Sequence, residues 1–535
     1  MIRRTGASVV RGAVAAAAAL ALSACAGPPP HPDVLIVTVD TLRADHLGAH
    51  GYAAAETPTI DSLLRRGVSF SNATTPMPRT TPALASMLTG LPPHLHGSRE
   101  VNQPVRPARP SPPAGDAPFL SEILRRRGYA TLAVSATLAA SPRYGLDRGF
   151  DRFDVITRPD NGAGRVTERV LRRVAEMPDD RPKLVWVHYM DPHAEYDPPP
   201  PWGDVPGREA CDELVRLAAT DGWSPGLIFS DRDGVASAAL ETCTALYDGE
   251  IAHVDAALGR LLDGLDKHLR MDRAIVVFTA DHGENLGEEG LYYEHGPSLH
   301  DASLRIPLGI SAPGVAAHRV DSDPATLEDV APTVLSLAGV PEREWRSMEG
   351  VDLSVRLRGG EGGEDAGERL VFAEGGSALQ VRNVRWLHSG RADHLHCLNA
   401  GRFSLCGPPG EEPGLFDHAT DPMLTRDVGD EHPEVRRRLL EARARWPPED
   451  ARQRCVRSAG FKLVARPLVD GGYSFALHDL ERDPAEARDA SGEHPRRSVR
   501  MRRALVAWMR QLPPREPRRR PEDEVKALRS LGYID

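Results

Sequence analysis

The sequence predicts an α/β fold in which a mostly parallel central sheet lies between layers of helices. Continuous apolar and β-branched runs recur along the chain, and such runs are typical of strands buried on both faces. Helical patterns separate these runs, and strands that alternate with helices form parallel sheets covered on both faces. The length of 535 residues favours one large domain with a smaller one beside it.

The main elements follow from these patterns in chain order. Buried strands are predicted at 34–39, 130–134, 184–187 and 274–279. Helices are predicted at 57–66, 120–127 and 244–265. Ligands of such folds bind at the carboxyl ends of the strands. Asp40, His188 and Asp281 each fall at the end of a predicted strand, so we expect them to share one site.

Residues 1–25 are predicted to be a secretory leader. Arg3 and Arg4 give a positive start, an apolar run follows at 13–22, and Leu-Ser-Ala-Cys ends at Cys25. The apolar run is too short for a spanning helix. The ending resembles a bacterial lipoprotein cleavage box, which implies lipidation of Cys25 and an exported protein held on a membrane of the bacterial cell envelope, on its periplasmic or surface side. The alternative is an ordinary cleaved signal in which the cysteine is incidental.

The net charge and the cysteines restrict the class of partner and indicate where disulfides could form. The net charge of −10 argues against a nucleic-acid partner. Residues 26–32 are proline-rich and predict a short, stiff tether. An exported protein can pair its cysteines, and Cys211 with Cys243 and Cys397 with Cys406 are the predicted pairs. Cys455 would then be left over.

The tail carries a degenerate repeat. Leu415-Phe416-Asp417 and Leu477-His478-Asp479 each follow a strand signal and each precede a Glu-His-Pro sequence and a helical pattern. We therefore predict a main domain at 33–368 and a C-terminal α+β subdomain at 369–535, with two related strand–helix units at about 378–446 and 455–508. A glycine- and acid-rich stretch at 359–367 is the predicted linker.

Thr80 is the candidate nucleophile. Pro82 suits the first turn of a helix, so Thr80 would stand just before the helix start, where backbone donors and the helix dipole favour a bound anion. A threonine hydroxyl is a weak nucleophile and needs a metal or a base. A capping threonine would explain the segment taken alone, but Asp40, Asp281 and His282 are the parts of a metal site that could activate it.

Three histidines are candidates for holding a transferring group or protonating a leaving oxygen. They lie in two sequences dense in possible ligands, one just after the strand at 184–187 and one after His282. The three are His188, His193 and His295, and Asp191 lies in the first of these sequences.

Taken in order, the motifs resemble those of the sulfatase family of the alkaline phosphatase superfamily. The matching sequences span most of the mature chain: the strand ending in Asp40, Gly51-Tyr52, Thr57-Pro58, Thr80-x-Pro82 with Leu88-Thr89-Gly90, His94-x-His96-Gly97, His188-x-x-Asp191-Pro192-His193, Tyr247-Asp248-Gly249-Glu250 with Asp255, Asp281-His282-Gly283-Glu284, His295-Gly296, Arg305-Ile306-Pro307-Leu308, Asp329-x-x-Pro332-Thr333 and Leu528-x-Ser530-Leu531-Gly532-Tyr533.

The resemblance implies an alkaline-phosphatase-like three-layer α/β/α sandwich with a small C-terminal subdomain, in which 33–368 is the catalytic domain. It implies one divalent cation held by Asp40, Thr80, Asp281 and His282, with Mn, Zn, Mg and Ca as candidates. His193 matches a histidine that contacts the substrate anion. The substrate would be a sulfate or phosphate ester of a small molecule, a glycan or a lipid.

Four positions depart from the usual sulfatase pattern. Thr80 stands where the family carries the cysteine or serine that is oxidised to formylglycine, and threonine cannot give that aldehyde. Leu84, Thr41 and His282 replace an arginine, an acidic ligand and an asparagine. These changes resemble the threonine-using phosphodiesterases and the phosphoglycerol and phosphoethanolamine transferases of the superfamily. No formylglycine is therefore expected.

These observations predict a metal-dependent hydrolase or transferase of charged esters, with phosphoesters slightly favoured over sulfate esters. Thr80 would attack, His193 would stabilise the transferring group, and His295 or His188 would assist the leaving group. A second metal could use Asp191, His193 and His295. The alternatives are a sulfatase that works without formylglycine, an envelope transferase, and a catalytically inactive envelope binding protein.

Overall fold

The structure is a computed structural model, and it describes most of the chain from residue 31 to residue 512. The described residues are 31–99, 104–105, 119–157, 159, 161–212, 227–228, 237–288, 291–296, 298–360, 369–377, 381–385, 394–400, 403–407, 412–417, 426–445, 452–467 and 473–512. The predicted leader with Cys25, most of the tether and most of the predicted linker lie outside them. Every helix in these ranges is too short or too polar to cross a membrane.

A sheet of eight strands forms the centre of the molecule. Its order is β12 (Arg319–Asp321), β2 (Val68–Phe70), β11 (Leu308–Ser311), β8 (Ile275–Ala280), β1 (Val34–Val39), β6 (Lys183–Tyr189), β4 (Ala130–Ser135) and β5 (Arg152–Val155). All neighbouring pairs are parallel except those of β11, which runs antiparallel to both β8 and β2. The predicted mostly parallel sheet is confirmed.

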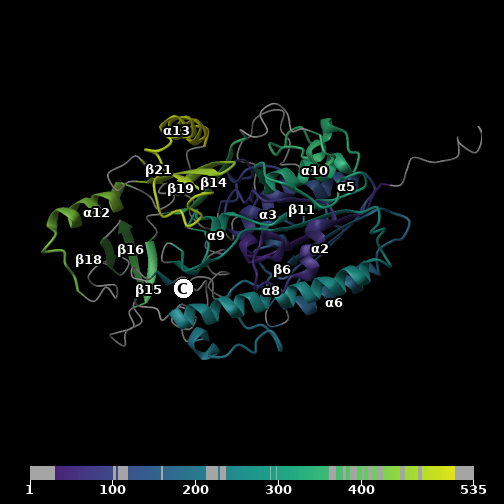
Figure 1. Cartoon of the computed structure of the whole chain (residues 1–535), viewed down its shortest axis with the longest axis horizontal. Coiled ribbons are helices and arrows are strands. Elements are labelled where there is room, and N and C mark those ends of the chain that lie inside the picture. The colour runs from purple at the N-terminus through teal and green to yellow at the C-terminus, as the bar shows by residue number, and fades with distance from the viewer. Residues whose placement is uncertain are drawn as a thin grey trace, which may run out of the picture.

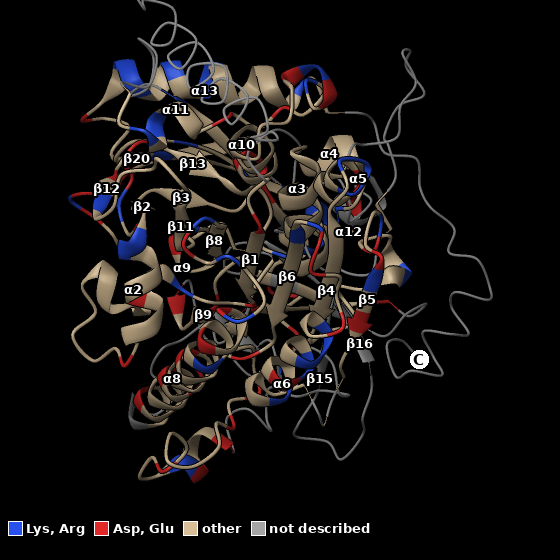
Figure 2. Cartoon of the chain, turned by 90° about the vertical axis from the view of Figure 1, so that its right-hand side faces the viewer, with Lys and Arg blue, Asp and Glu red and all other residues tan. Residues whose placement is uncertain are grey.

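Strand β1 shows why the sequence folds in this way. All six of its residues are buried, and none is charged, so the strand is tan in Figure 2. Its last residue, Val39, pairs with Tyr189 of β6 on one side and with Ala280 of β8 on the other. This register brings the residues that follow β1 and β8, Asp40 and Asp281, to the same carboxyl edge of the sheet.

Helices cover both faces of this sheet and complete the predicted three layers (Figure 1). One face carries α2 (Pro58–Arg66), α6 (Ala163–Val174) and α8 (Ser237–Leu265), and the other carries α3 (Thr80–Thr89), α5 (Leu120–Arg126) and α10 (Val330–Leu337). Short helices are α4 (Pro93–His96), α9 (Asp301–Leu304) and α11 (Ser354–Leu357), with 3-10 turns at Ala44–His46, Gly48–His50, Pro142–Tyr144, Leu327–Asp329 and Glu342–Glu344. Two small sheets pair β3 (Ala73–Thr74) with β13 (Ala325–Thr326), and β10 (Leu291–Glu294) with β7 (Leu227–Ile228) and β9 (Asn285–Leu286).

Helix α8 begins earlier than its predicted start at residue 244. Ala238, Ala239 and Leu240 are good helix formers, so the helix extends back to Ser237. A disulfide between Cys211 and Cys243 fastens this end of the helix to the segment after β6, with a Cα–Cα distance of 5.0 Å. The predicted pair is therefore confirmed.

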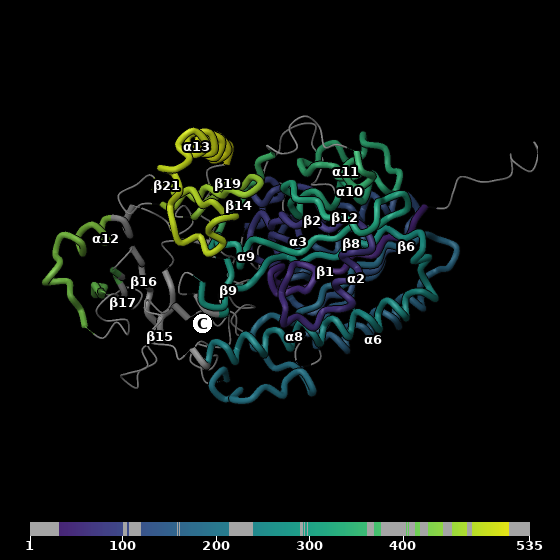
Figure 3. Tube along the Cα trace, viewed as in Figure 1, coloured from purple at the N-terminus to yellow at the C-terminus, as the bar shows by residue number. Residues whose placement is uncertain are grey.

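Two antiparallel sheets, each followed by a helix, form the C-terminal part. The first unit contains β15 (Val381–Arg385), β16 (His394–Ala400), β17 (Phe403–Gly407), β18 (Gly414–Asp417) and α12 (Pro433–Arg445). The second unit contains β14 (Val371–Ser377), β19 (Arg452–Ser458), β20 (Phe461–Pro467), β21 (Tyr473–Asp479) and α13 (Pro495–Met509). Because β14 precedes the first unit but pairs with β19, the first unit is inserted between two neighbouring strands of the second. Figure 3 shows α12 at the end of the molecule farthest from the central sheet.

The two units repeat each other's turn contacts. In the first, the Leu415 amide donates to Asp427 Oδ1 at 3.0 Å, and the Val428 amide donates to the Leu415 carbonyl at 2.7 Å. In the second, the corresponding bonds join Leu477 to Asp489 and Ala490 to Leu477, at 3.0 and 2.7 Å. In β16 and β17 the backbone of Cys397 lies directly opposite that of Cys406, and Cys455 is a buried free thiol.

The second unit packs against the loops that reach the carboxyl edge of the main sheet. Leu299 and Leu304 of the main domain share a buried apolar cluster with Ala373, Cys455 and Val464. Beside it, Lys462 Nζ donates to the Leu299 carbonyl at 2.7 Å and to Asp301 Oδ1 at 3.1 Å. The Glu374 amide bonds the Pro76 carbonyl at 3.0 Å, close to the start of α3. The sheet of the second unit therefore packs against the loops around Thr80 and His295.

Candidate metal and catalytic site

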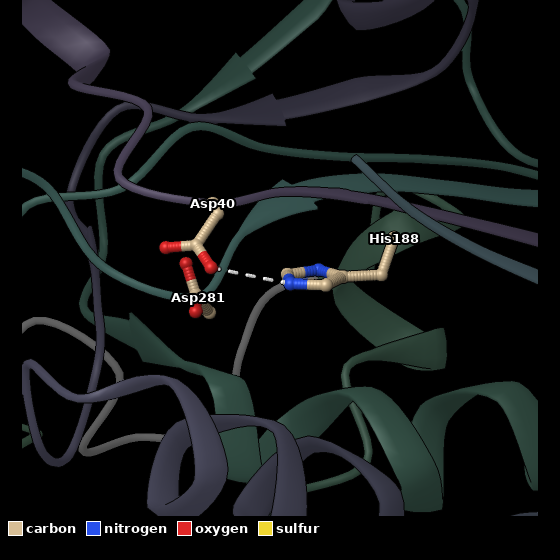
Figure 4. A group of neighbouring side chains, drawn as sticks. All are labelled: Asp40, His188 and Asp281. Atoms are coloured by element: carbon tan, nitrogen blue, oxygen red, sulfur yellow. Dashed lines mark ion pairs between the residues drawn. The ribbon is translucent and has the colours of Figure 1, made fainter. Parts of the chain in front are cut away.

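The predicted site residues gather where β1, β6 and β8 end. Asp40 follows β1, His188 is near the end of β6, and Asp281 with His282 follows β8. Figure 4 shows the side chains of Asp40, His188 and Asp281 converging. One possible ligand atom from each of the three lies within 4.8 Å of the other two. All four side chains are buried.

The ring orientation of His188 is fixed by the strand beside it. Its Nδ1 lies 2.9 Å from Thr38 Oγ1, which accepts from Trp186 Nε1 at 3.0 Å and donates to the Val187 carbonyl at 3.2 Å. Since a hydroxyl has one proton, Thr38 accepts from His188, and the imidazole carries its proton on Nδ1. The Nε2 lone pair then points at Asp40 Oδ2, 3.4 Å away.

The ring of His282 also carries its proton on Nδ1. Its Nδ1 lies 3.0 Å from the Gly283 carbonyl, which can only accept, so the proton is on Nδ1. The Nε2 lone pair faces Asp281 Oδ2 at 3.4 Å, Asp40 Oδ1 at 3.8 Å and Thr80 Oγ1 at 3.5 Å. A lone pair aimed at carboxylate oxygens is repelled by them unless a cation lies between, and an Nδ1–H bonded to a carbonyl is how proteins orient metal-binding histidines.

The environment of the two carboxylates also favours binding of a cation. Both oxygens of Asp40, Oδ2 of Asp281 and Nε2 of His188 are buried without a hydrogen-bond partner, and such groups are rare in folded proteins unless an ion satisfies them. Burial raises the pKa of Asp281 well above its usual value, and the neighbouring Asp40 raises it further. The donor set of two carboxylates and two imidazoles fits a divalent metal ion.

Thr80 is the first residue of α3, one position inside the start that the sequence predicted. Arg79 is extended, and the ten residues from Thr80 to Thr89 form a fully buried helix. The Thr80 hydroxyl lies 3.5 Å from His282 Nε2, at the end of the helix where backbone amides and the dipole favour an anion. A hydroxyl in this place can contact both a cation and a bound anion.

Thr41 keeps a strained backbone directly after Asp40. Its φ is 53°, a conformation that residues other than glycine rarely adopt. Tyr247 holds the turn: its hydroxyl donates to the Thr41 carbonyl at 2.7 Å and accepts from the Arg43 amide at 3.0 Å. The Thr41 amide itself faces Asp281 Oδ1 at 3.3 Å. The strained turn therefore aligns Asp40 with Asp281.

A stack of histidines extends from the carboxylates. The rings of His282 and His295 are stacked with centroids 4.4 Å apart, and His193 meets His295 edge-on at 5.1 Å. His295 Nδ1 lies 3.0 Å from Glu284 Oε1. Glu284 is fully buried, and burial raises its pKa to about 8, although the charge of His193 acts in the opposite direction. His193 and His295 thus lie beside the cation-binding groups, where an ester substrate would sit.

Asp191 lies elsewhere. It groups with Glu250 and His253, so the second metal set suggested by the sequence, Asp191 with His193 and His295, does not converge in the structure. The cause is the turn after β6, which places Asp191 and His193 in different surroundings. His253 was missed in the sequence, and Glu250 and Glu284 were noted only as parts of motifs, because nothing in the sequence showed which side chains they contact.

We expect Glu284 to position His295. Replacing Glu284 by leucine removes the hydrogen-bond partner of His295 Nδ1 and should lower kcat/KM by about 100-fold, whereas glutamine, which can still form a hydrogen bond, should cost about 10-fold. The matched control is Glu288→Gln, because Glu288 pairs with Arg43 rather than with a histidine. Steady-state kinetics with folding monitored by circular dichroism measures the effect. Equal losses in the leucine and glutamine variants would contradict the positioning role.

Comparisons with known proteins find similarity to sulfatases and to a phosphonate monoester hydrolase. A family model described as Sulfatase matches residues 32–340. The chain is 24% identical to an arylsulfatase of Clostridium perfringens over 60% of its own length and 77% of the relative. It is 25% identical to a choline-sulfatase of Rhizobium meliloti over 73% and 81% of the two chains. Among solved structures, a phosphonate monoester hydrolase from Silicibacter pomeroyi superposes with a TM-score of 0.60 at 20% identity, covering 90% of this chain and 96% of that one.

Proposed function

Because the chain belongs to the sulfatase family, we propose that it is a metal-dependent hydrolase of charged esters that uses Thr80 as its nucleophile and prefers phosphoesters to sulfate esters. The observation that carries the proposal is the position of the Thr80 hydroxyl, 3.5 Å from His282 Nε2, at a helix start beside Asp40 and Asp281. A hydroxyl that only capped the helix would have no need of this surrounding set of metal-binding groups.

Asp40, Asp281, His188 and His282 would hold the cation. When bound, a divalent ion supplies Lewis-acid chemistry, which polarises an ester oxygen and favours ionisation of a nearby hydroxyl. Thr80 Oγ1 forms a bond to the phosphorus or sulfur atom and releases its proton to water, while the bond to the leaving oxygen breaks and that oxygen takes a proton from His295. Water, or an acceptor alcohol in a transferase, then releases the group from Thr80.

The chain's remaining groups bind and orient the ester. The amides at the start of α3 favour the oxygens of the transferring group. His295 stacks on His282 and contacts His193, so both histidines are suited to bind an anionic oxygen or to protonate the leaving oxygen. His188 faces Asp40 instead, so we assign it to cation binding, and the leaving group to His295.

The preference for phosphoesters rests on the chemistry of Thr80. Oxidation of a threonine side chain at Cβ gives a ketone and not the aldehyde of formylglycine, so the usual sulfatase nucleophile cannot form. The solved phosphonate monoester hydrolase also acts, by its name, on a phosphorus ester. The curated relatives are sulfatases by name, and a sulfatase that works without formylglycine is therefore the second candidate.

A substrate panel tests the preference. Purified protein loaded with Mn²⁺ or Zn²⁺ should cleave an aryl phosphodiester or an aryl phosphonate monoester at least about 10-fold faster, in kcat/KM, than the matching aryl sulfate. A reversed order would support the sulfatase. Product formation only when an acceptor alcohol is added would support a transferase, and no cleavage of any ester with metal bound would support the inactive binding protein.

We also propose that the enzyme is exported and lipid-anchored at Cys25 in the cell envelope. The support is the sequence of residues 1–25, with its positive start, short apolar run and Leu-Ser-Ala-Cys ending. Fractionation of cells that express the full chain tests it, since recovery in the soluble cytoplasmic fraction would contradict it.

A further inference from the structure

Asp191, Glu250 and His253 form a second group of metal-binding side chains. One possible ligand atom from each lies within 4.8 Å of the other two. Asp191 belongs to the turn after β6, while Glu250 and His253 both lie on α8. A spacing of three residues brings side chains to the same face of a helix, so the two α8 side chains meet the turn together.

The segment that follows Asp191 lies along this face of α8. The Asp197 amide donates to Glu250 Oε1 at 2.8 Å, and the Trp202 indole lies 5.1 Å from the His253 ring. Gly249 has no side chain because a Cβ there would come within 2.5 Å of the Trp202 carbonyl. The chain therefore passes close over α8, and the side chains of His253 and Asp191 keep only 12% and 14% of their surface exposed.

Three atoms of the group are buried and have no hydrogen-bond partner: Asp191 Oδ2, Glu250 Oε2 and His253 Nδ1. Glu250 is only 5% exposed. His253 Nδ1 is 3.7 Å from Asp191 Oδ1, which is too long for a hydrogen bond. Buried polar atoms without partners, gathered within 4.8 Å of one another, favour binding of a shared cation.

Two neighbouring carboxylates, of which Glu250 is buried and Asp191 partly buried, repel each other unless they are neutralised. Burial raises the pKa of Glu250 to about 9, and the charge of Asp191 contributes to the increase, so a shared proton is one solution. A proton between the carboxylates would leave His253 Nδ1 without a partner, whereas a cation would satisfy all three side chains. Ligand atoms on opposite sides of a Zn²⁺ or Mn²⁺ ion lie about 4 Å apart, close to the spacing found here.

We propose that Asp191, Glu250 and His253 bind a first-row divalent cation, separate from the cation at Asp40 and Asp281, and that this ion fastens the segment bearing His193 to α8. Two carboxylates and one imidazole suit Zn²⁺, Mn²⁺ or Fe²⁺ better than Ca²⁺, which prefers six to eight oxygen ligands. Three protein ligands leave the remaining positions to water.

The position of the group gives the second ion a role. His193 is two residues from Asp191 and meets the His295 ring at 5.1 Å. The Ala194 amide approaches Glu284, and Asp197 is tied to Glu250. An ion at Asp191 would fix the first residue of this short segment and so hold His193 beside the substrate anion. Asp191, Glu250 and His253 are in this sense positioning residues.

Metal counting tests the proposal independently of activity. Protein that has been saturated with Zn²⁺ or Mn²⁺ and then desalted should contain two ions per chain, as measured by elemental mass spectrometry. His253→Ala and Glu250→Gln should each retain one, and Asp281→Asn should also retain one. His268→Ala, which changes a histidine just beyond α8 in neither group, should retain two.

A spectroscopic titration with Co²⁺ tests the same site without relying on variants that fold poorly. Asp281→Asn keeps only the Asp191 group intact, so Co²⁺ added to it should give visible absorption bands at one equivalent, and a His253→Gln change in the same chain should abolish them. One ion in the wild-type protein, unchanged by His253→Ala, would overturn the proposal in favour of a shared proton. Failure of Thr80 chemistry alone would leave these counts unaltered, so the two proposals are distinguishable.

Discussion

Replacing Thr80 by valine is expected to abolish ester cleavage while the protein stays folded. Valine has nearly the shape of threonine, so the buried start of α3 keeps its packing. The loss removes the group that forms the covalent bond, and removal of a nucleophile lowers kcat by about 10³-fold or more. The metal sites do not depend on this hydroxyl alone, because Asp40, His188, Asp281 and His282 remain.

The neighbouring residue provides a matched control. Thr81 is also buried at the start of α3, but its hydroxyl donates to the Ala139 carbonyl at 2.7 Å and not toward the carboxylates. Thr81→Val should therefore cost about 1 kcal/mol of stability and leave kcat nearly unchanged. Thr80→Ser should keep measurable activity, because it retains the hydroxyl.

Steady-state kinetics on the preferred aryl ester, with Mn²⁺ or Zn²⁺ present, measures these variants. Rapid acid quenching followed by peptide mass spectrometry should find the transferred group on Thr80 in the wild-type protein. Metal-dependent cleavage that persists in Thr80→Val would show that a water molecule or another side chain attacks, and the proposed mechanism would then be wrong.

The strands and their polar ends could be predicted from the sequence because burial on both faces leaves a strong pattern. The run at 34–39 has no polar alternation, so it had to be a central strand, and Asp40 had to fall at its carboxyl end. The same argument placed His188 and Asp281. Parallel register then brings these three together without any knowledge of side-chain contacts.

Side-chain partners outside regular elements could not be predicted in this way. The turn after β6 has no periodicity, so no pattern indicates that Asp191 faces α8 while His193 faces His295. The proton position on His188 depends on Thr38 and Trp186, which lie on two neighbouring strands. The insertion of the first C-terminal unit between β14 and β19 was hidden because strand pairing across an insertion leaves no local signal.

Asp281→Asn is expected to eliminate activity and yet to stabilise the metal-free protein. Asp281 and Asp40 are buried side by side, so that burial raises the pKa of Asp281 above its unfolded value and the charge of Asp40 raises it further. When folding raises the pKa of a carboxyl group, the free energy of unfolding falls as the pH rises from the unfolded pKa to the folded pKa. In this range the unfolded state releases the proton while the folded state retains it. Asparagine carries no charge, so this loss of stability at neutral pH should disappear.

Metal binding should reverse the order of the melting temperatures of the wild-type protein and Asp281→Asn. A ligand that binds only the folded state stabilises it by RT ln(1 + [L]/Kd), about 2.7 kcal/mol at a hundredfold excess over Kd. Wild-type protein should therefore melt at a lower temperature than Asp281→Asn in a chelator and gain more on addition of Mn²⁺ or Zn²⁺. The ion at Asp191 should still give Asp281→Asn a smaller increase.

Thermal unfolding at pH 5 and pH 8, with and without metal, measures both effects. The control is Asp248→Asn, because Asp248 lies near the site but bonds His46 and Tyr52, each at 2.7 Å, and joins neither group of metal-binding residues. This variant should keep the wild-type response to metal. If Asp281→Asn melts below the wild-type protein in chelator at pH 8, then the two carboxylates do not repel each other as the geometry requires, and the assignment of this site to a cation would lose its main physical support.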